Sequence, residues 1–282
     1  MPERFCSSPE CKEVKTYCLP AEDRERCIEI SLEESDGSVP VCPAVGGVGI
    51  YDVANAASKA QEMSADMIAI IPPPWITVEV DAVRCIEQVS RSVEVPVMIH
   101  TAFGGPAAKI FSSEIIDRLL REVPNIRYVK VEGPRFVQQA ADINATSGDT
   151  VVRLMSAPNW GAVYRAGCRL LMIAAHIIEP VVAIFKALER KDDQAEERID
   201  TDLAPYYAVE GYVPGEICNK TVAHWRGIFA NARRGSPQLS PSPATLLPAE
   251  RAMLARSLSS LMKYFTTFPL QLPEEPSVKT QN

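Results

Sequence analysis

Short apolar segments alternate with amphipathic segments along the chain from about Val39 to Ile173, and this alternation constrains the fold more than any other feature. The apolar segments are mostly rich in Val, Ile or Met and are bounded by Pro, Gly or Asp, as is typical of buried parallel strands. Regular strand–helix alternation with short connections predicts an α/β fold with a parallel sheet. The expected strands are residues 39–45, 67–71, 95–99, 128–132, 151–155 and 170–173.

Helices are expected between the first four of these strands, because apolar residues recur there at helical spacing. They cover residues 53–63, 80–93 and 112–121, with Ser112 marking a helix entry and Pro124 a stop. Six strand–helix units can be counted in this way. A doubly wound sheet can use six strands, whereas a (β/α)8 barrel needs eight, and the pattern alone does not choose between them.

The character of the sequence changes after the sixth expected strand. Helices are expected over residues 179–190, 192–203, 218–232 and 249–264, with no strand between them. The Ser- and Pro-rich residues 235–248 are expected to form a linker or a surface loop. The sequence therefore predicts four parts, which are a divergent Cys-containing segment (1–18), a strand–helix domain (19–178), a helical region (179–268) and a flexible tail (269–282).

Composition argues against several classes of function. The chain has 29 Lys and Arg against 36 Asp and Glu, and the resulting charge of −7 argues against a nucleic-acid partner. No apolar run reaches the roughly 18 residues that a membrane helix needs. The start, Met1 to Arg4, does not open a signal peptide, so we expect a cytoplasmic protein whose 8 cysteines are reduced. Cys6, Cys11 and Cys18 do not have the paired spacing typical of zinc sites.

A lysine interrupts the apolar segment that is expected to form the fourth strand. Lys130 lies near the carboxyl end of this strand, where barrel enzymes place catalytic groups. Apolar neighbours disfavour an ammonium group, and an unprotonated amine can attack a keto group to form a Schiff base. The alternative is an ion pair with Glu132, whose side chain faces the same way because it lies two residues further along the strand. Both interpretations stay open at this point.

Several short motifs follow one another in a fixed order. They are Val-Pro-Val (39–41), Val-Gly-Gly (45–47), Ala-Asp-Met-Ile (65–68), Ile-Pro-Pro-Pro (71–74), Val-Pro-Val-Met-Ile (95–99), the segments 112–119 and 124–130, Ala-Gly-Cys (166–168), Leu-Ala-Pro (203–205), and Lys220 with Arg226 and Gly227. In this series the chain resembles the dihydrodipicolinate synthase / N-acetylneuraminate lyase family of class I aldolases. The resemblance runs from about Leu19 to Tyr264 and so covers most of the chain.

The resemblance implies a fold, an activity and a nucleophile. The family folds as a (β/α)8 TIM barrel with an added helical C-terminal region, so residues 19–178 would form a barrel and residues 179–268 the extension. Lys130 falls on the family's Schiff-base lysine, which reacts with pyruvate or another 2-keto acid. The implied activity is that of a lyase that makes or breaks a carbon–carbon or carbon–oxygen bond. No metal or organic cofactor is implied, and the family implies a homo-oligomer, either a dimer or a tetramer.

The chain departs from the family's pattern around the expected site. Where the family has Tyr-Asn-x-Pro, this chain has His100 and Thr101. His100 would act as the general acid or base in place of the tyrosine, or it is a neutral structural histidine. Thr101, Glu132, Ser156 and Ala157 are the expected substrate-binding residues. Glu132 could orient the substrate, tune the lysine or form a plain ion pair, while Ser156 and Ala157 would narrow the pocket where the family has glycine.

The largest departure lies at the N-terminal end. Residues 1–18 lack the Thr-Thr-Gly-Glu sequence with which the family holds the substrate carboxylate, and the match begins at the family's second helix. The barrel is therefore expected to be incomplete, without its first two strand–helix units, which would leave open sheet edges. A longer gene product, a remodelled region or a completing partner chain could each account for this. A second hypothesis is therefore a catalytically impaired or non-catalytic family member that acts as a partner subunit, or a truncated gene product.

Overall fold

The computed structural model describes residues 19–103, 109–132, 135–147, 152–155, 160–213, 215–232 and 246–272. The chain divides into two compact units, Met1–Met172 and Ile173–Asn282, whereas the sequence places the division after residue 178. Cys6, Cys11 and Cys18, most of the expected linker and the tail beyond residue 272 lie outside the described residues. The expected absence of the first two strand–helix units stays a prediction, because it concerns residues 1–18, which also lie outside the described residues.

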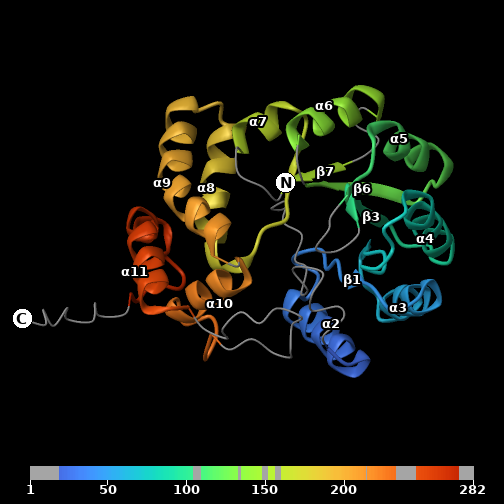
Figure 1. The fold of residues 1–282 in the computed structure, drawn as a ribbon, viewed down its shortest axis with the longest axis horizontal. Helices are drawn as coiled ribbons and strands as arrows, with labels where there is room; N and C mark the ends of the chain where they lie inside the picture. The colour runs from blue at the N-terminus through green and yellow to red at the C-terminus, as the bar shows by residue number, and fades with distance from the viewer. Residues whose placement is uncertain are drawn as a thin grey trace, which may run out of the picture. The chain divides into compact units, whose positions relative to one another are not determined.

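Six parallel strands form one sheet in the described part of the first unit (Figure 1). They follow one another in space in the order β1-β2-β3-β6-β7-β8, and every neighbouring pair is parallel. The predicted α/β class with a parallel sheet is thus confirmed. The strands are β1 (Ala44–Val45), β2 (Ile68–Ile70), β3 (Val97–His100), β6 (Ile126–Val131), β7 (Val152–Met155) and β8 (Leu170–Leu171).

Two features of the strands differ from the expectation. β1 is much shorter than the expected strand over residues 39–45, because Pro40 and Pro43 have no N–H to donate to a ladder. Pro43 contributes only its carbonyl, which accepts a hydrogen bond from the Ala69 N–H at 2.9 Å. An unexpected antiparallel pair, β4 (Ala102–Phe103) and β5 (Lys109–Ile110), follows β3.

One helix precedes β1 in the described part of this unit and the others follow strands, and Figure 1 shows α3 to α7 in succession along the outside of the sheet. They are α2 (Ala21–Ser35), α3 (Ile50–Glu62), α4 (Glu79–Arg91), α5 (Ser113–Glu122), α6 (Phe136–Ser147) and α7 (Trp160–Arg165). The expected entry of α5 is confirmed, because the Ser112 side chain accepts a hydrogen bond from the Ile115 N–H at 3.3 Å. α6 and α7 were not among the helices that the sequence specified.

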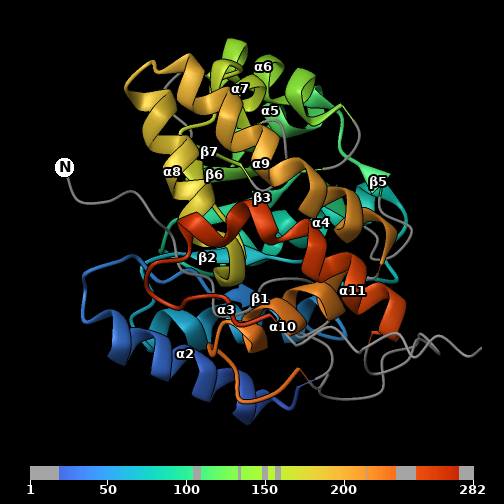
Figure 2. The same ribbon diagram turned by 90° about the vertical axis from the view of Figure 1, so that its left-hand side faces the viewer.

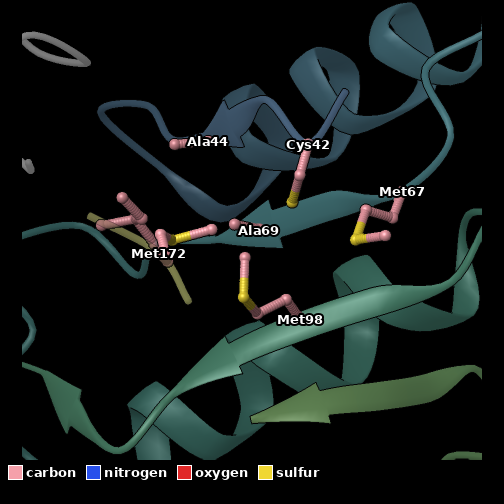
Figure 3. Packing of buried hydrophobic residues seen from close by; sticks show 7 residues of the cluster. Cys42, Ala44, Met67, Ala69, Met98 and Met172 are labelled. Carbon is pink, nitrogen blue, oxygen red and sulfur yellow. The ribbon is translucent and has the colours of Figure 1, made fainter. Parts of the chain in front are cut away.

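Buried side chains of the strands and of neighbouring segments form an apolar cluster (Figure 3). Sulfur-containing and small side chains dominate it, with Tyr128 and Leu170 packed against its edge. Because side chains alternate along a strand, the residues two positions after Met98 and Tyr128 lie on the same face. These residues are His100 and Lys130, so the cluster forms the layer beneath them. The cluster consists of Cys42, Ala44, Met67, Ala69, Ile71, Met98 and Met172.

The second unit is helical in its described part, as the sequence predicts. Figure 2 shows α8 and α9 running alongside each other. α9 continues through Pro205 to Tyr212, well past the expected end at residue 203, and the expected helix over 249–264 is divided into an α-helix and a 3-10 helix. The elements are η3 (Ala175–Ile177), α8 (Ile178–Glu189), α9 (Asp193–Tyr212), α10 (Gly215–Trp225), α11 (Pro248–Ser257) and η4 (Ser259–Tyr264). Among the described residues, no helix has the length and apolar character needed to cross a membrane.

Buried polar groups link the elements of the second unit. His176 Nε2 lies 2.6 Å from the Tyr206 hydroxyl, which donates to Asn219 Oδ1 at 3.1 Å. The Arg226 guanidinium donates to the His176 carbonyl at 2.7 Å and forms an ion pair with Glu179. These contacts connect η3, α8, α9 and α10, so they stabilise the unit from within.

Candidate active site

A shift in strand register places the two principal candidate residues opposite each other. The ladder between β3 and β6 shifts between Val97 and Met98, so that β6 has one additional residue there. Beyond the shift, His100 pairs with Lys130. Without it, His100 would pair with Val129, whose side chain points to the opposite face of the sheet. The shift therefore brings the imidazole and the amine to the same face.

Lys130, Glu132 and His100 form a connected polar group, which we call the Lys–Glu–His group. Lys130 Nζ lies 2.6 Å from Glu132 Oε1, and His100 Nδ1 lies 3.5 Å from Glu132 Oε2. One carboxylate thus contacts both nitrogen groups, one through each oxygen. The Lys130 side chain is only 10% exposed, whereas that of Glu132 is 32% exposed. The group is therefore buried at its lysine end and reaches water at its carboxylate end.

The electrostatics of the group favour an ionised carboxylate. Burial alone would raise the pKa of Glu132, but the Lys130 ammonium and the hydrogen bond from His100 hold that pKa well below its usual range. Glu132 is consequently a carboxylate at neutral pH, and the resting state of the pair is ionic. The ion pair between Lys130 and Glu132, one of the two interpretations that the sequence left open, is present in the structure.

Thr101 lies next to this group but makes different contacts. Its side chain is fully buried, and its hydroxyl donates to the Glu132 carbonyl at 3.0 Å and accepts from the Glu132 N–H at 2.9 Å. The structure therefore brings together four of the six predicted site residues, which are Lys130, His100, Glu132 and Thr101. Ser156 and Ala157 lie outside the described residues.

Sequence reasoning did not single out Tyr128, which lies on the same strand face two residues before Lys130. Its side chain is partly buried and packs against the apolar cluster beneath the site. Side chains two residues apart along a strand lie on the same face. Applying this rule to the residues before Lys130, as well as to Glu132 after it, would have identified Tyr128. In the described part of the chain, His, Cys, Asp and Glu side chains do not gather in groups of three that could hold a metal ion.

A separate open cleft of about 760 Å³ lies in the first unit, between α2, α3 and the segment that follows β1. Arg24, Lys59 and Trp75 are among the residues that line it. None of the four described site residues lines this cleft. Gly46 and Gly47 border this cleft. A side chain at Gly47 would collide with Asp52, because its Cβ would lie too close to the Asp52 Cβ.

Comparison with curated proteins finds relatives of related chemistry. The chain is 24% identical to the L-2-keto-3-deoxyarabonate dehydratase of Azospirillum brasilense over 254 residues, which cover 87% of this chain and 81% of the relative. A shorter match of 83 residues is 34% identical to the putative 2-dehydro-3-deoxy-D-gluconate aldolase YagE of Escherichia coli K12, and it covers 29% of this chain and 28% of the relative. No protein-family model matches the chain.

Solved structures agree with these sequence matches. A dihydrodipicolinate synthase superposes with a TM-score of 0.78 at 16% identity, over 92% of this chain and 88% of that one. The YagE protein of Escherichia coli K12, solved with pyruvate, superposes with a TM-score of 0.74 at 18% identity, over 88% of this chain and 84% of that one. The fold is therefore that of these TIM-barrel proteins. Taken with the sequence relatives, it supports the resemblance of the chain to the dihydrodipicolinate synthase family.

Proposed function

We propose that the protein is a lyase that forms a Schiff base between Lys130 and pyruvate or a related 2-keto acid. The observation that carries the proposal is the 2.6 Å contact of Lys130 Nζ with Glu132, whose second oxygen lies 3.5 Å from His100. A buried amine beside two groups that can exchange protons fits imine chemistry, which needs several proton transfers around one nitrogen. The names of the relatives, a keto-deoxy sugar acid dehydratase and an aldolase, support the same substrate class.

The Lys–Glu–His group can supply the proton transfers that imine formation requires. The Lys130 ammonium must lose a proton before the amine can attack the C2 carbonyl, and Glu132 Oε1 is within hydrogen-bonding distance to accept it. Attack gives a carbinolamine, which expels water when its hydroxyl is protonated. His100, on the other oxygen of Glu132, is the second group that can give or take a proton. The product is a protonated imine, which withdraws electrons from C3.

The same group would decide the fate of a substrate that carries a hydroxyl on C4. If that hydroxyl loses its proton to a base, C4 becomes a carbonyl carbon and the C3–C4 bond breaks. The electron pair of that bond forms a C2–C3 double bond while the C=N pair moves to the nitrogen, which gives an enamine and is aldol cleavage. If C3 loses a proton and the C4 hydroxyl receives one, water leaves and a carbon–carbon double bond forms, which is dehydration. We favour dehydration, because a relative that matches 87% of the chain is named a keto-deoxy sugar acid dehydratase. The reacting substrate would then be a 2-keto-3-deoxy sugar acid.

Further parts of the proposal concern the protein's surroundings. No metal or organic cofactor is required, because the imine withdraws the electrons. We propose that Ser156 and Ala157 border the substrate, that the protein forms a homo-oligomer, and that it acts in the cytoplasm. These parts rest on the resemblance to the family and on the sequence composition.

Borohydride trapping tests the proposal directly. The folded protein is incubated with pyruvate or with a 2-keto-3-deoxy sugar acid, reduced with borohydride and analysed by intact-mass and peptide mass spectrometry. We expect one reduced imine adduct on Lys130. The adduct should be lost in Lys130→Ala and kept in Lys186→Ala, a matched control in which an exposed lysine of α8 is removed. Wild-type protein that is folded by circular dichroism and gives no adduct with either acid would refute the proposal.

A further inference from the structure

We infer that Thr101 is a positioning residue, whose hydroxyl fixes the backbone of Glu132 and thereby holds the Glu132 carboxylate between Lys130 and His100. This inference rests on the proposed function for its catalytic meaning, but its structural content can be tested without any substrate. It differs from the sequence expectation, in which Thr101 contacts the substrate itself.

Thr101 forms hydrogen bonds with β6 and the residue after it through both its main chain and its side chain. The Thr101 N–H donates to the Lys130 carbonyl at 3.0 Å and continues the ladder between β3 and β6. The hydroxyl then takes over where β6 ends at Val131, because it donates to the Glu132 carbonyl and accepts from the Glu132 N–H. A single oxygen atom thus satisfies both main-chain groups of the residue that follows the strand.

A hydroxyl is suited to this task because it both donates and accepts at one atom. The Glu132 carboxylate lies only a few bonds from the two main-chain groups that Thr101 holds. Rotation of the backbone at this residue would therefore move the carboxylate away from Lys130, which is fixed within the ladder. Thr101 restricts that rotation, so it sets the carboxylate position without contacting the carboxylate.

Thr101 is itself anchored from the other side. Its carbonyl accepts a hydrogen bond from the Phe111 N–H at 2.9 Å, and the Phe111 carbonyl accepts from Gln139 Nε2 at 2.6 Å. Phe111 and Gln139 are both buried. The chain of contacts therefore runs from α6 through Phe111 and Thr101 to Glu132, which gives the positioning residue a rigid support.

The same geometry argues against a direct substrate contact. The Thr101 side chain is fully buried, and its one hydroxyl proton is already donated to the Glu132 carbonyl. A substrate that reaches the exposed end of the Lys–Glu–His group meets Glu132 before it could meet Thr101.

Two substitutions separate the hydroxyl from the shape of the side chain. Thr101→Val keeps the branched shape and removes the donor and the acceptor, whereas Thr101→Ser keeps both. We expect Thr101→Val to slow borohydride-trapped adduct formation about tenfold, which is the scale on which a lost buried hydrogen-bond partner acts. Thr101→Ser should stay near the wild-type rate. If Thr101→Ser loses as much as Thr101→Val, packing is responsible and the inference is wrong.

A double-substitution cycle tests whether Thr101 acts through Glu132. In a Glu132→Gln background, Thr101→Val should cause little further loss, because the carboxylate that it positions is already absent. Independent, multiplicative losses would overturn the inference. Thr221→Val, a buried threonine of the second unit, is the matched control and should leave the trapping rate unchanged.

A readout without substrate keeps the two proposals distinguishable. The side-chain carboxyl of Glu132 can be followed by carbon NMR in glutamate-labelled protein, with the signal assigned by Glu132→Gln. The titratable groups that face it are Lys130 and His100, and losing their proximity should raise the Glu132 pKa in Thr101→Val. An unchanged titration in folded Thr101→Val, or in Thr101→Ala if the valine variant does not fold, would overturn the inference. This result stands even if wild-type protein forms no adduct, an outcome that refutes only the proposed function.

Discussion

Replacing Glu132 by Gln should destabilise the protein at neutral pH, because it leaves the Lys130 ammonium buried without its counter-ion. Breaking a fully buried ion pair costs about 3–5 kcal/mol. Glu132 is 32% exposed, so water screens part of the effect, and we expect a loss of about 2 kcal/mol in the free energy of unfolding. That corresponds to a decrease of about 4–8 °C in Tm. Urea unfolding followed by circular dichroism measures it.

The pH dependence identifies the cause of this loss. The pKa of Glu132 is lowered in the folded state, while an unfolded glutamate titrates near pH ~4.3. Its contribution to stability is therefore fully present above pH ~4.3 and is lost as the pH falls through the folded-state pKa. Since glutamine does not titrate, the difference between wild type and Glu132→Gln should be full near pH 7 and should shrink below about pH 4.

An exposed glutamate provides the matched control for this experiment. Glu29 lies 2.9 Å from Arg26, but both side chains are about half exposed, at 50% and 57%. Glu29→Gln should therefore leave the unfolding curve unchanged, because solvent screens exposed ion pairs. The reasoning is refuted if Glu132→Gln is as stable as wild type at neutral pH, or if the difference stays constant as the pH is lowered.

Three further predictions follow from buried groups and from assembly. Burial raises the pKa of Cys85 to about 11 and that of Cys218 to about 12, so an aromatic disulfide at pH ~8 should modify the partly exposed Cys27 faster than either of these two thiols, and equal labelling rates at the three positions would contradict this. Arg226→Leu should lower the free energy of unfolding by about 3–5 kcal/mol, because Glu179 loses its buried partner, and a urea titration showing no loss would contradict this. Size-exclusion chromatography with light scattering should give a dimer or a tetramer, and a clean monomer would contradict the proposed assembly.

Local rules along the chain predicted a large part of the fold. Apolar runs located the strands of the parallel sheet, and the period of two predicted that Lys130 and Glu132 share a face, as their contact shows. The shortening of β1 was also accessible, because Pro40 and Pro43 lie within the expected strand and cannot donate to a ladder. These predictions succeed because each depends on residues that are neighbours in sequence.

Features that depend on two strands at once were not accessible in this way. The pairing of His100 with Lys130 requires the register shift at Val97 and Met98, and no residue type in the sequence marks it. The contact of Thr101 with the Glu132 main chain depends on the same register. Because the strand register decides which groups the Thr101 hydroxyl meets, these hydrogen bonds could not be derived from the sequence.

In the proposed reaction, the ion pair between Lys130 and Glu132 would have to open before the lysine attacks a substrate. Lys130 is only 10% exposed, whereas Glu132 is 32% exposed, so Glu132 is the member of the pair that is more accessible from solvent. In the proposed reaction, the carboxylate of a keto acid would compete with Glu132 for the positive charge of Lys130. Under the same proposal, transfer of the lysine proton to Glu132 would neutralise both groups and produce the amine that attacks the substrate. The Glu132 carboxylate, 2.6 Å from Lys130 Nζ and partly buried, would therefore serve two purposes. It stabilises the charged lysine in the resting site, and it would accept the lysine proton when the ion pair opens.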